Sequence, residues 1–237
     1  MPTPAPIRLR VVGDRTPAFQ SHRELDAALV RLPAGVEARW CASDDPAVRD
    51  LTGIHGVWIA PGSPYRDDAA VLDVLRQARE GGVPLLATCG GLQYAALELA
   101  RNLAGLPDAA HAEVSPDAPA PVVERLACSL FAQVRTVHPV PGTRFAALVG
   151  TSPFPGTHFC NFGLAEAHVP RLVAAGVVVT ARAEDAGVEG FELPRHPFYQ
   201  ATLFQPQIGA LAGAPTHPLV LGLVEAARVR ASAGSGR

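Results

Sequence analysis

The chain alternates short apolar runs with longer amphipathic segments of helical periodicity. The apolar runs cover residues 7–12, 36–42, 56–60 and 83–88, and the amphipathic segments cover residues 21–32, 67–80 and 90–103. Short continuous apolar runs are typical of buried strands, and the longer period is typical of helices that pack on one face. Strands that alternate with helices predict βαβ units, and therefore a parallel sheet covered by helices on both faces.

The second half of the chain predicts further strands around the same core. Segments 145–149, 177–181, 188–191 and 197–204 are predicted strands, residues 217–231 are a predicted final helix, and the proline- and alanine-rich residues 115–123 are a predicted loop. A length of 237 residues is typical of one large domain. We therefore predict a three-layer α/β domain over residues 7–231, with flexible ends at residues 1–6 and 232–237.

Two helix starts carry recognisable signals. Ser21 is followed three residues later by Glu24, the pattern of a capping box, which predicts that the first helix begins at Ser21. Asp67 and Asp68 are predicted to begin the next helix, where a negative charge is favourable against the helix dipole. We assign these two aspartates no chemistry.

Composition excludes several function classes. The formal net charge is −2 and no basic cluster occurs, which argues against a nucleic-acid or membrane surface. The chain has no lysine, so it lacks the residue used in Schiff-base chemistry and in the P-loop. No apolar run is long enough for a membrane span and no signal peptide is evident, so we expect a cytoplasmic protein. Small molecules or other proteins are the expected partners.

The cysteines are Cys41, Cys89, Cys128 and Cys160, and they lack the paired spacing of a zinc site. In a cytoplasmic setting they also predict no disulfide framework. His158 and Cys160 form the one close His/Cys pair, which is too few ligands for zinc. We therefore expect no metal and no other cofactor.

Cys89 lies where the predicted strand 83–88 ends and a helix opened by Gly90 and Gly91 begins. Such a turn holds a side chain over the edge of a sheet, with the following N–H groups directed at an oxyanion. The helix N-terminus also favours a thiolate. The pattern therefore predicts a nucleophilic cysteine, and the alternative is a buried, inert thiol. Gly62 follows another strand and is expected at the same edge.

Several short motifs occur in the order found in one known family. They are Ile59-Ala60-Pro61-Gly62, Cys89-Gly90-Gly91-Leu92-Gln93, Ala100-Arg101-Asn102-Leu103-Ala104-Gly105-Leu106 with Glu113, His196-Pro197-Phe198-Tyr199, and Leu221-Gly222-Leu223-Val224-Glu225-Ala226-Ala227. Together they resemble the glutaminase domain of CTP synthase, a class I glutamine amidotransferase, over about residues 7–230. The resemblance implies a flavodoxin-like α/β fold and a link to pyrimidine nucleotide biosynthesis.

In that family a cysteine attacks the side-chain amide of glutamine, a histidine passes a proton to the departing ammonia, and a glutamate orients the histidine. The resemblance implies that Cys89 is the nucleophile and that Gly62 and Gly90 supply the oxyanion hole. Gln93 and Glu113 match residues that contact the amino-acid part of the substrate. Taken singly, Gln93 is also an ordinary polar residue of a helix and Glu113 a solvated loop carboxylate.

The chain departs from the family where the histidine and glutamate are expected, because Gln205 and Gln207 take their places. Glutamine cannot shuttle a proton near neutral pH, and general acid–base catalysis is worth ~10²–10⁴-fold in rate. Ordinary glutamine hydrolysis should therefore be severely reduced. The family's segment with the carboxylate-binding arginine is replaced roughly by residues 157–161, in which His158 is a candidate substrate contact and surrogate base.

These observations leave three functional hypotheses. The leading one is a stand-alone CTP synthase-like amidotransferase domain that uses Cys89 on an amide or related carbon electrophile other than standard glutamine. A separate synthetase or acceptor protein would then carry any ATP-dependent step. The second is a catalytically dead pseudo-amidotransferase that binds or regulates, and the third is a thiol-redox protein that uses Cys89. The reactivity of Cys89 distinguishes them.

Overall fold

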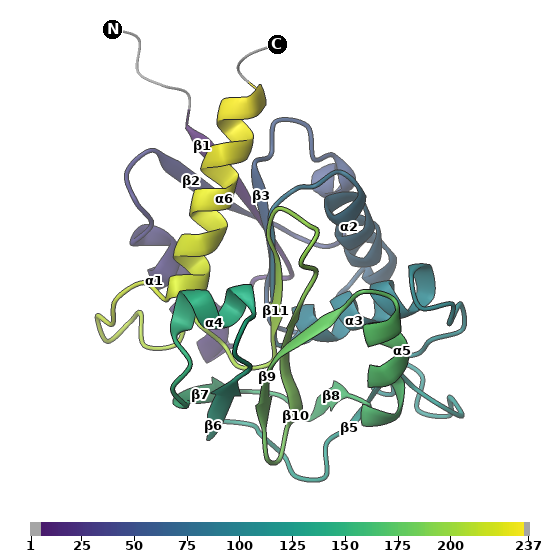
Figure 1. Ribbon diagram of the computed structural model, residues 1–237. Coiled ribbons are helices and arrows are strands. Elements are labelled where there is room, and N and C mark those ends of the chain that lie inside the picture. The colour runs from purple at the N-terminus through teal and green to yellow at the C-terminus, as the bar shows by residue number, and fades with distance from the viewer. Residues whose placement is uncertain (1–5, 235–237) are drawn as a thin grey trace, which may run out of the picture.

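A nine-stranded mixed sheet runs through the computed structural model, which describes residues 6–234 (Figure 1). The strand order is β2-β1-β3-β4-β11-β10-β9-β6-β7. In that order the strands are Val36–Cys41, Ile7–Val12, Gly56–Ile59, Leu85–Thr88, Tyr199–Thr202, Gly187–Glu192, Val178–Ala183, Gln133–Pro139 and Phe154–His158. A separate two-stranded sheet pairs β5 (Val123–Arg125) with β8 (Phe162–Leu164).

The sheet has a parallel half and an antiparallel half. Strands β2, β1, β3, β4 and β11 pair in parallel, and the pairs from β11 through β10, β9 and β6 to β7 are antiparallel. Every residue of β3, β4 and β11 is buried, as expected for strands covered on both faces. The carboxyl ends of these three strands meet at one edge of the sheet, where ligands bind in open α/β folds.

Helices cover both faces of the sheet (Figure 1). On one side lie α1 (Gln20–Val30), α4 (Arg144–Val149) and α6 (Pro218–Gly234), and on the other α2 (Asp68–Glu80), α3 (Gly90–Asn102) and α5 (Val169–Ala174). Short 3₁₀ turns occur at Pro46–Arg49 and Glu166–His168. Each side has its own apolar core, one built on Trp58, Phe145 and Leu223 and the other on Ile59, Leu75 and Leu92. The predicted three-layer α/β architecture is confirmed.

One predicted strand is wrong: residues 145–149 belong to helix α4. Thr143 caps this helix by accepting a 3.1 Å hydrogen bond from the Ala146 N–H. The carboxylate of Glu192 accepts hydrogen bonds from the backbone N–H groups of Arg144 and Phe145 at the same end. A buried carboxylate at the N-terminus favours the helix, and a contact from so distant a strand leaves no local signal.

Two strands of the antiparallel half, β6 and β7, are not predicted from the sequence. Pro139, Pro153 and Pro155 make their segments resemble loops. β7 is an edge strand of the described sheet, and edge strands tolerate proline. α5 was also missed, a short helix with a proline in its first turn.

Helix ends differ from the sequence pattern in two places. α1 begins at Gln20 and its N-cap is Phe19, which makes no side-chain capping bond, so the predicted capping box is wrong. Glu24 instead accepts a 2.8 Å hydrogen bond from the Leu211 N–H. At the other end, α6 continues to Gly234, beyond the predicted end at residue 231. Residues 1–5 and 235–237 of the predicted flexible ends lie outside the described residues. Asp67 does cap α2, through the Ala70 N–H.

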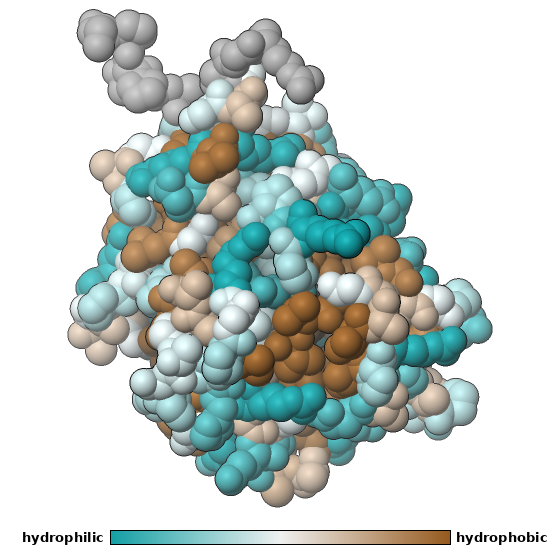
Figure 2. Space-filling view, in the orientation of Figure 1, coloured by the Kyte–Doolittle hydropathy of each residue, from teal (hydrophilic) through white to brown (hydrophobic). Residues whose placement is uncertain are grey.

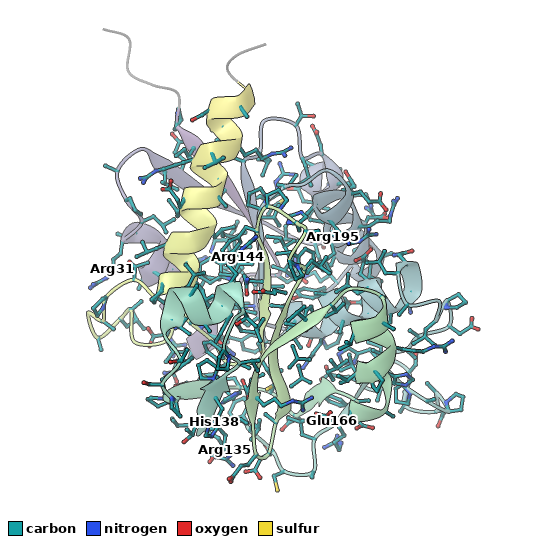
Figure 3. The ribbon with its side chains drawn as sticks, in the orientation of Figure 1. Arg31, Arg135, His138, Arg144, Glu166 and Arg195 are labelled. Carbon is teal, nitrogen blue, oxygen red and sulfur yellow. The ribbon has the colours of Figure 1, made fainter. Side chains whose placement is uncertain are left out.

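Arg144 links helix α4 to the turn between β10 and β11. Arg144 of α4 points into the turn between β10 and β11, where its guanidinium donates to the carbonyl of Pro197 at 2.6 Å (Figure 3).

Figure 2 shows an apolar area on this face over β9 and α5, bordered by polar residues. Within residues 6–234, no helix has the length and hydropathy needed to cross a membrane.

Candidate active site

The turn between β4 and α3 holds Cys89 in a strained conformation. Cys89 has φ 54° and ψ −112°, values that a residue with a Cβ adopts only at a cost of roughly 1–3 kcal/mol. Its N–H donates a 2.8 Å hydrogen bond to the carbonyl of Thr202 at the end of β11. The turn therefore fixes the sulfur at the carboxyl edge of the parallel strands, as in a nucleophile elbow.

Two glycines let the helix approach its neighbours closely. A Cβ built on Gly90 would lie 2.8 Å from the backbone nitrogen of Ser63, and one on Gly91 would lie 2.6 Å from the carbonyl oxygen of Ile59. Both distances are too short for any larger residue. The double glycine after Cys89 is thus explained by packing of α3 against the loop that follows β3.

A cavity of about 430 Å³ opens above Cys89. It is lined by Ala18, Phe19, Gln20, Ser21, Arg23, Pro61, Gly62, Ser63, Cys89, Gln93, Glu113, Phe131, Ala132, Phe159, Cys160, Asn161, Phe162 and Gln205. Of the residues singled out in the sequence, Cys89, Gly62, Gln93, Glu113 and Gln205 meet there. No histidine is among these lining residues, and the charged side chains in the lining are Arg23 and Glu113.

The loop that carries Gly62 is oriented by His22 of α1. Nδ1 of His22 accepts a 3.0 Å hydrogen bond from the Thr16 N–H, so Nε2 carries the proton and donates at 2.8 Å to the carbonyl of Pro61. Burial lowers the pKa of His22, which favours this neutral form. In a planar trans peptide the C=O and N–H point in opposite directions, so the Gly62 N–H is directed away from His22. In the described chain, no backbone carbonyl accepts from it.

Both the oxygen and the nitrogen of the Gln93 side-chain amide form hydrogen bonds within the protein. Its oxygen accepts from the Ser63 hydroxyl and from Nε2 of His111, both at 3.0 Å, and its nitrogen donates to the Phe162 carbonyl at 2.7 Å. Gln93 therefore ties α3 to the Ser63 loop and to β8. Gln93 lines the cavity, but its amide oxygen and nitrogen bond to protein groups.

Glu113 lies at the solvent side of the cavity. Partial burial raises the pKa of its carboxyl group, while the charge of Arg125 acts in the opposite direction. The residue is largely exposed overall, and its N–H donates to Nδ1 of His111 at 3.1 Å. A ligand with a positive charge would therefore meet a carboxylate at this wall.

The side-chain amides of Gln205 and Gln207 are joined by a hydrogen bond. Nε2 of Gln207 donates to Oε1 of Gln205 at 2.9 Å and also lies 3.4 Å from the carbonyl oxygen of Ser21. The oxygen of Gln205 is therefore occupied, and its Nε2 group faces Cys89. That nitrogen makes no hydrogen bond of ordinary geometry within the described chain, yet it is close enough to lower the pKa of the thiol. The pair presents a donor to the sulfur and takes no proton from it.

Cys160 lies beside Cys89, a neighbour that the sequence did not indicate. The interaction with the Cys160 side chain is the largest cause of the lowered pKa of Cys89. Burial acts against it, and the Gly90 N–H and Gln205 add to it. The same contact, with burial, raises the pKa of Cys160. Cys89 has the lowered pKa of the two and Cys160 the raised one, so Cys89 is the more readily ionised thiol of the pair.

His158 is absent from the lining of the cavity. Its Nε2 lies 2.7 Å from Oε1 of Glu189 on β10, and both side chains are fully buried. The other Glu189 oxygen accepts from the Phe204 N–H at 3.2 Å, next to Gln205. The His158–Glu189 pair supports the segment that carries Gln205, and it leaves the cavity without a basic side chain from β7.

The comparisons with known proteins agree with this geometry. The model of the Peptidase C26 family matches residues 60–206, from the end of β3 to Pro206. The chain belongs to this family. Within residues 6–234, no cluster of three or more metal-ligating side chains occurs. This family match, with the relatives and the solved structure described next, identifies a CTP synthase-like class I glutamine amidotransferase domain.

Curated relatives of this amidotransferase domain are CTP synthases. The enzyme from Pyrobaculum calidifontis is 36% identical over 193 residues, covering 77% of this chain and 36% of the relative. That from Synechococcus sp. is 34% identical over 239 residues, covering 93% of this chain and 44% of the relative. The chain thus spans less than half the length of these relatives.

Among solved structures, the Trypanosoma brucei CTP synthase glutaminase domain with bound acivicin superposes with a TM-score of 0.80 at 20% identity, covering 93% of each chain. A glutamine amidotransferase from Thermotoga maritima superposes with a TM-score of 0.58 at 12% identity, covering 97% of this chain and 86% of the other. At these identities the superpositions show a shared fold.

Proposed function

We propose that Cys89 forms a thioester with an amino-acid-like acyl substrate, and that the domain turns over ordinary glutamine slowly. The observation that carries the proposal is the strained turn that places Cys89 in a cavity lined by no described histidine, where contacts with Cys160, Gly90 and Gln205 lower the pKa of its thiol. A thiolate that exists without a base can attack directly. The missing histidine affects the later steps, in which protons must move.

The chemistry separates into steps that the site supports and steps that it does not. The sulfur attacks the carbonyl carbon, and the developing oxyanion is received by the N–H groups of Gly62 and Gly90. Expulsion of ammonia from glutamine needs a proton that Gln205 cannot give, at a cost of ~10²–10⁴-fold in rate. A thiolate or phenolate leaving group needs no such proton. Hydrolysis of the thioester also lacks a base, so the acyl-enzyme accumulates.

The charged lining residues support an amino-acid-like substrate. Arg23 and Glu113 carry opposite charges on the cavity wall, and an amino acid presents a carboxylate and an ammonium group. Arg23 comes from α1, where its Nη1 group donates to the carbonyls of Pro17 and Ala18 at 2.6 and 3.3 Å. We assign the carboxylate to Arg23 and the ammonium group to Glu113. Arg23 thereby supplies the positive charge that the segment 157–161 lacks.

An acceptor for any transferred group would lie on another protein or domain, as the greater length of the CTP synthase relatives suggests. The rim of the cavity carries exposed aromatic side chains suited to such a contact. Phe131 is 61% exposed and Phe19 is 49% exposed, and both line the cavity. Small-molecule and protein partners are thus both proposed.

The proposal is tested by pre-steady-state kinetics with an activated γ-glutamyl thioester and with glutamine. The thioester should release one equivalent of thiol in a burst and leave a γ-glutamyl adduct on Cys89, followed by slow turnover. Glutamine should give no burst. Cys89→Ala should lose the adduct, and Cys128→Ala, at an exposed cysteine outside the cavity, should keep it. A reduced protein that binds the thioester without forming an adduct would instead be a binding protein.

A further inference from the structure

Two cysteines from distant parts of the chain meet in the cavity. Cys89 follows β4, and Cys160 lies in the short connection between β7 and β8. Both line the cavity, both side chains are free, and each residue is 6% exposed. The two residues belong to one buried cluster, and each side chain shifts the pKa of the other, as expected for neighbouring thiols. Cys41 and Cys128 line no part of this cavity.

We propose that Cys89 and Cys160 form a reversible disulfide when the domain meets a hydroperoxide, with Cys89 as the attacking thiolate and Cys160 as the resolving thiol. In the first step the Cys89 thiolate attacks one oxygen of the hydroperoxide, the S–O bond forms and the O–O bond breaks. Cys89 becomes a sulfenic acid, and the other oxygen leaves as an alcohol or water after taking up a proton from solvent. In the second step Cys160 attacks the Cys89 sulfur, the S–S bond forms, the S–O bond breaks and water leaves. The peroxide is the oxidant, and an external dithiol reduces the disulfide.

The electrostatics of the pair favour this order of events. The contact with Cys89 is the largest cause of the raised pKa of Cys160, ahead of burial and the charge of Glu189. A sulfenic acid on Cys89 is neutral, so its formation removes the negative charge beside Cys160. Cys160 then loses its proton more readily, when it has to act as the nucleophile.

The backbone around both cysteines is anchored by hydrogen bonds. The Cys89 N–H is bonded to the Thr202 carbonyl at 2.8 Å, and the Cys160 carbonyl accepts from the Leu130 N–H at 3.1 Å. The disulfide would occupy the sulfur that forms the thioester, so oxidation would switch off acyl transfer. This inference requires a reactive Cys89 thiolate and is otherwise independent of acyl transfer, since it needs no acyl substrate.

Peptide mapping by mass spectrometry after one equivalent of hydrogen peroxide tests the proposal. The reduced protein has four free cysteines. Oxidation should leave Cys41 and Cys128 free, join Cys89 to Cys160 within one chain, and be reversed by dithiothreitol. Cys160→Ser should lose the disulfide and leave a Cys89 sulfenic acid that dimedone traps. Cys128→Ser should behave as the unaltered protein does.

Two outcomes would overturn the proposal. One is dimedone labelling of Cys89 in the unaltered protein while the Cys160 thiol stays free. The other is a disulfide that uses Cys41 or Cys128. If Cys160→Ser fails to fold, the disulfide map of the unaltered protein still decides the question. The reduced protein keeps its thioester burst in either case, so failure here is distinct from failure of the proposed acyl transfer.

Discussion

The side-chain amide of Gln207 donates a 2.9 Å hydrogen bond to the amide oxygen of Gln205. Because this bond occupies the oxygen of Gln205, only the amide nitrogen of Gln205 is left to interact with Cys89, and that interaction lowers the pKa of the thiol. The two glutamines thus form a unit that stabilises negative charge on sulfur and transfers no proton. A thiolate supported in this way can attack, but it has no partner for the departing amine.

Restoring the acid and base should recover part of the glutaminase activity. The double variant Gln205→His with Gln207→Glu should raise glutamine hydrolysis about 10- to 100-fold, below the ~10²–10⁴-fold that general acid–base catalysis supplies. The gain is limited because Nε2 of Gln207 lies 3.4 Å from the Ser21 carbonyl oxygen, which would repel a carboxylate there. Ammonia release measures the rate. Gln205→Leu is the control and should show no gain, and recovery to full family rates would contradict this account.

His22 should act on the reaction through the loop that carries Gly62. His22→Phe removes the donor to the Pro61 carbonyl and should slow thioester formation about 10-fold or more, below the ~10²–10³-fold cost of losing an oxyanion donor outright. The effect should fall on the acylation rate, with little change in apparent substrate affinity. His22→Gln keeps an amide donor near Nε2 and should restore much of the rate. Equal loss in both variants would argue that His22 contributes packing alone.

Stability should fall in acid because of His111. Burial lowers the pKa of this histidine from 6.5 to about 4. Nε2 of His111 lies 3.0 Å from the Gln93 oxygen and Nδ1 accepts the Glu113 N–H, so the folded state holds the neutral ring. Below about pH 6.5 the unfolded chain binds a proton that the folded chain refuses, so the stabilisation present above that pH is lost as the pH falls toward about 4.

The size of this effect is about 3 kcal/mol over the window, at 1.36 kcal/mol per pKa unit. His111→Gln removes the titrating group and should show a flatter dependence of the unfolding free energy on pH. Urea titrations at about pH 7 and pH 4 measure it. His217, whose pKa burial also lowers to about 4, stays in both proteins and is the internal reference. A constant difference between the proteins at both pH values would contradict the prediction.

The sequence was most informative where the signal is local. The strand, turn and helix around Cys89 are predictable because apolar residues, two glycines and helical periodicity follow one another within one short segment. Gly62 and Cys89 could be placed at one edge because carboxyl ends of parallel strands share it. Gln93 and Glu113 are also at the cavity, although the bonds of Gln93 go to protein groups.

The rest of the site depends on contacts between distant segments. Arg23 and His22 reach the cavity or its loop from α1, and nothing near them in the sequence marks such a position. Cys160 lies in the segment 157–161 that the resemblance placed near the substrate, but no pattern in the sequence indicated its contact with Cys89. His158 is the opposite case. The segment 157–161 made it a candidate substrate contact, but its side chain is buried against Glu189. Its family-derived role stays a prediction. A histidine on a strand that is itself unpredicted cannot be assigned a direction from sequence.

The pH dependence of Cys89 alkylation tests the central claim most directly. Iodoacetamide labelling followed by peptide mapping gives the apparent pKa and rate for each cysteine in one sample. The account predicts that Cys89 reacts faster than Cys41, Cys128 and Cys160 near neutral pH, with a pKa below the ~8.5 of a free thiol. Gln205→Leu should raise that pKa. If Cys89 reacts no faster than the exposed Cys128, it is not a stabilised thiolate, and the account is contradicted.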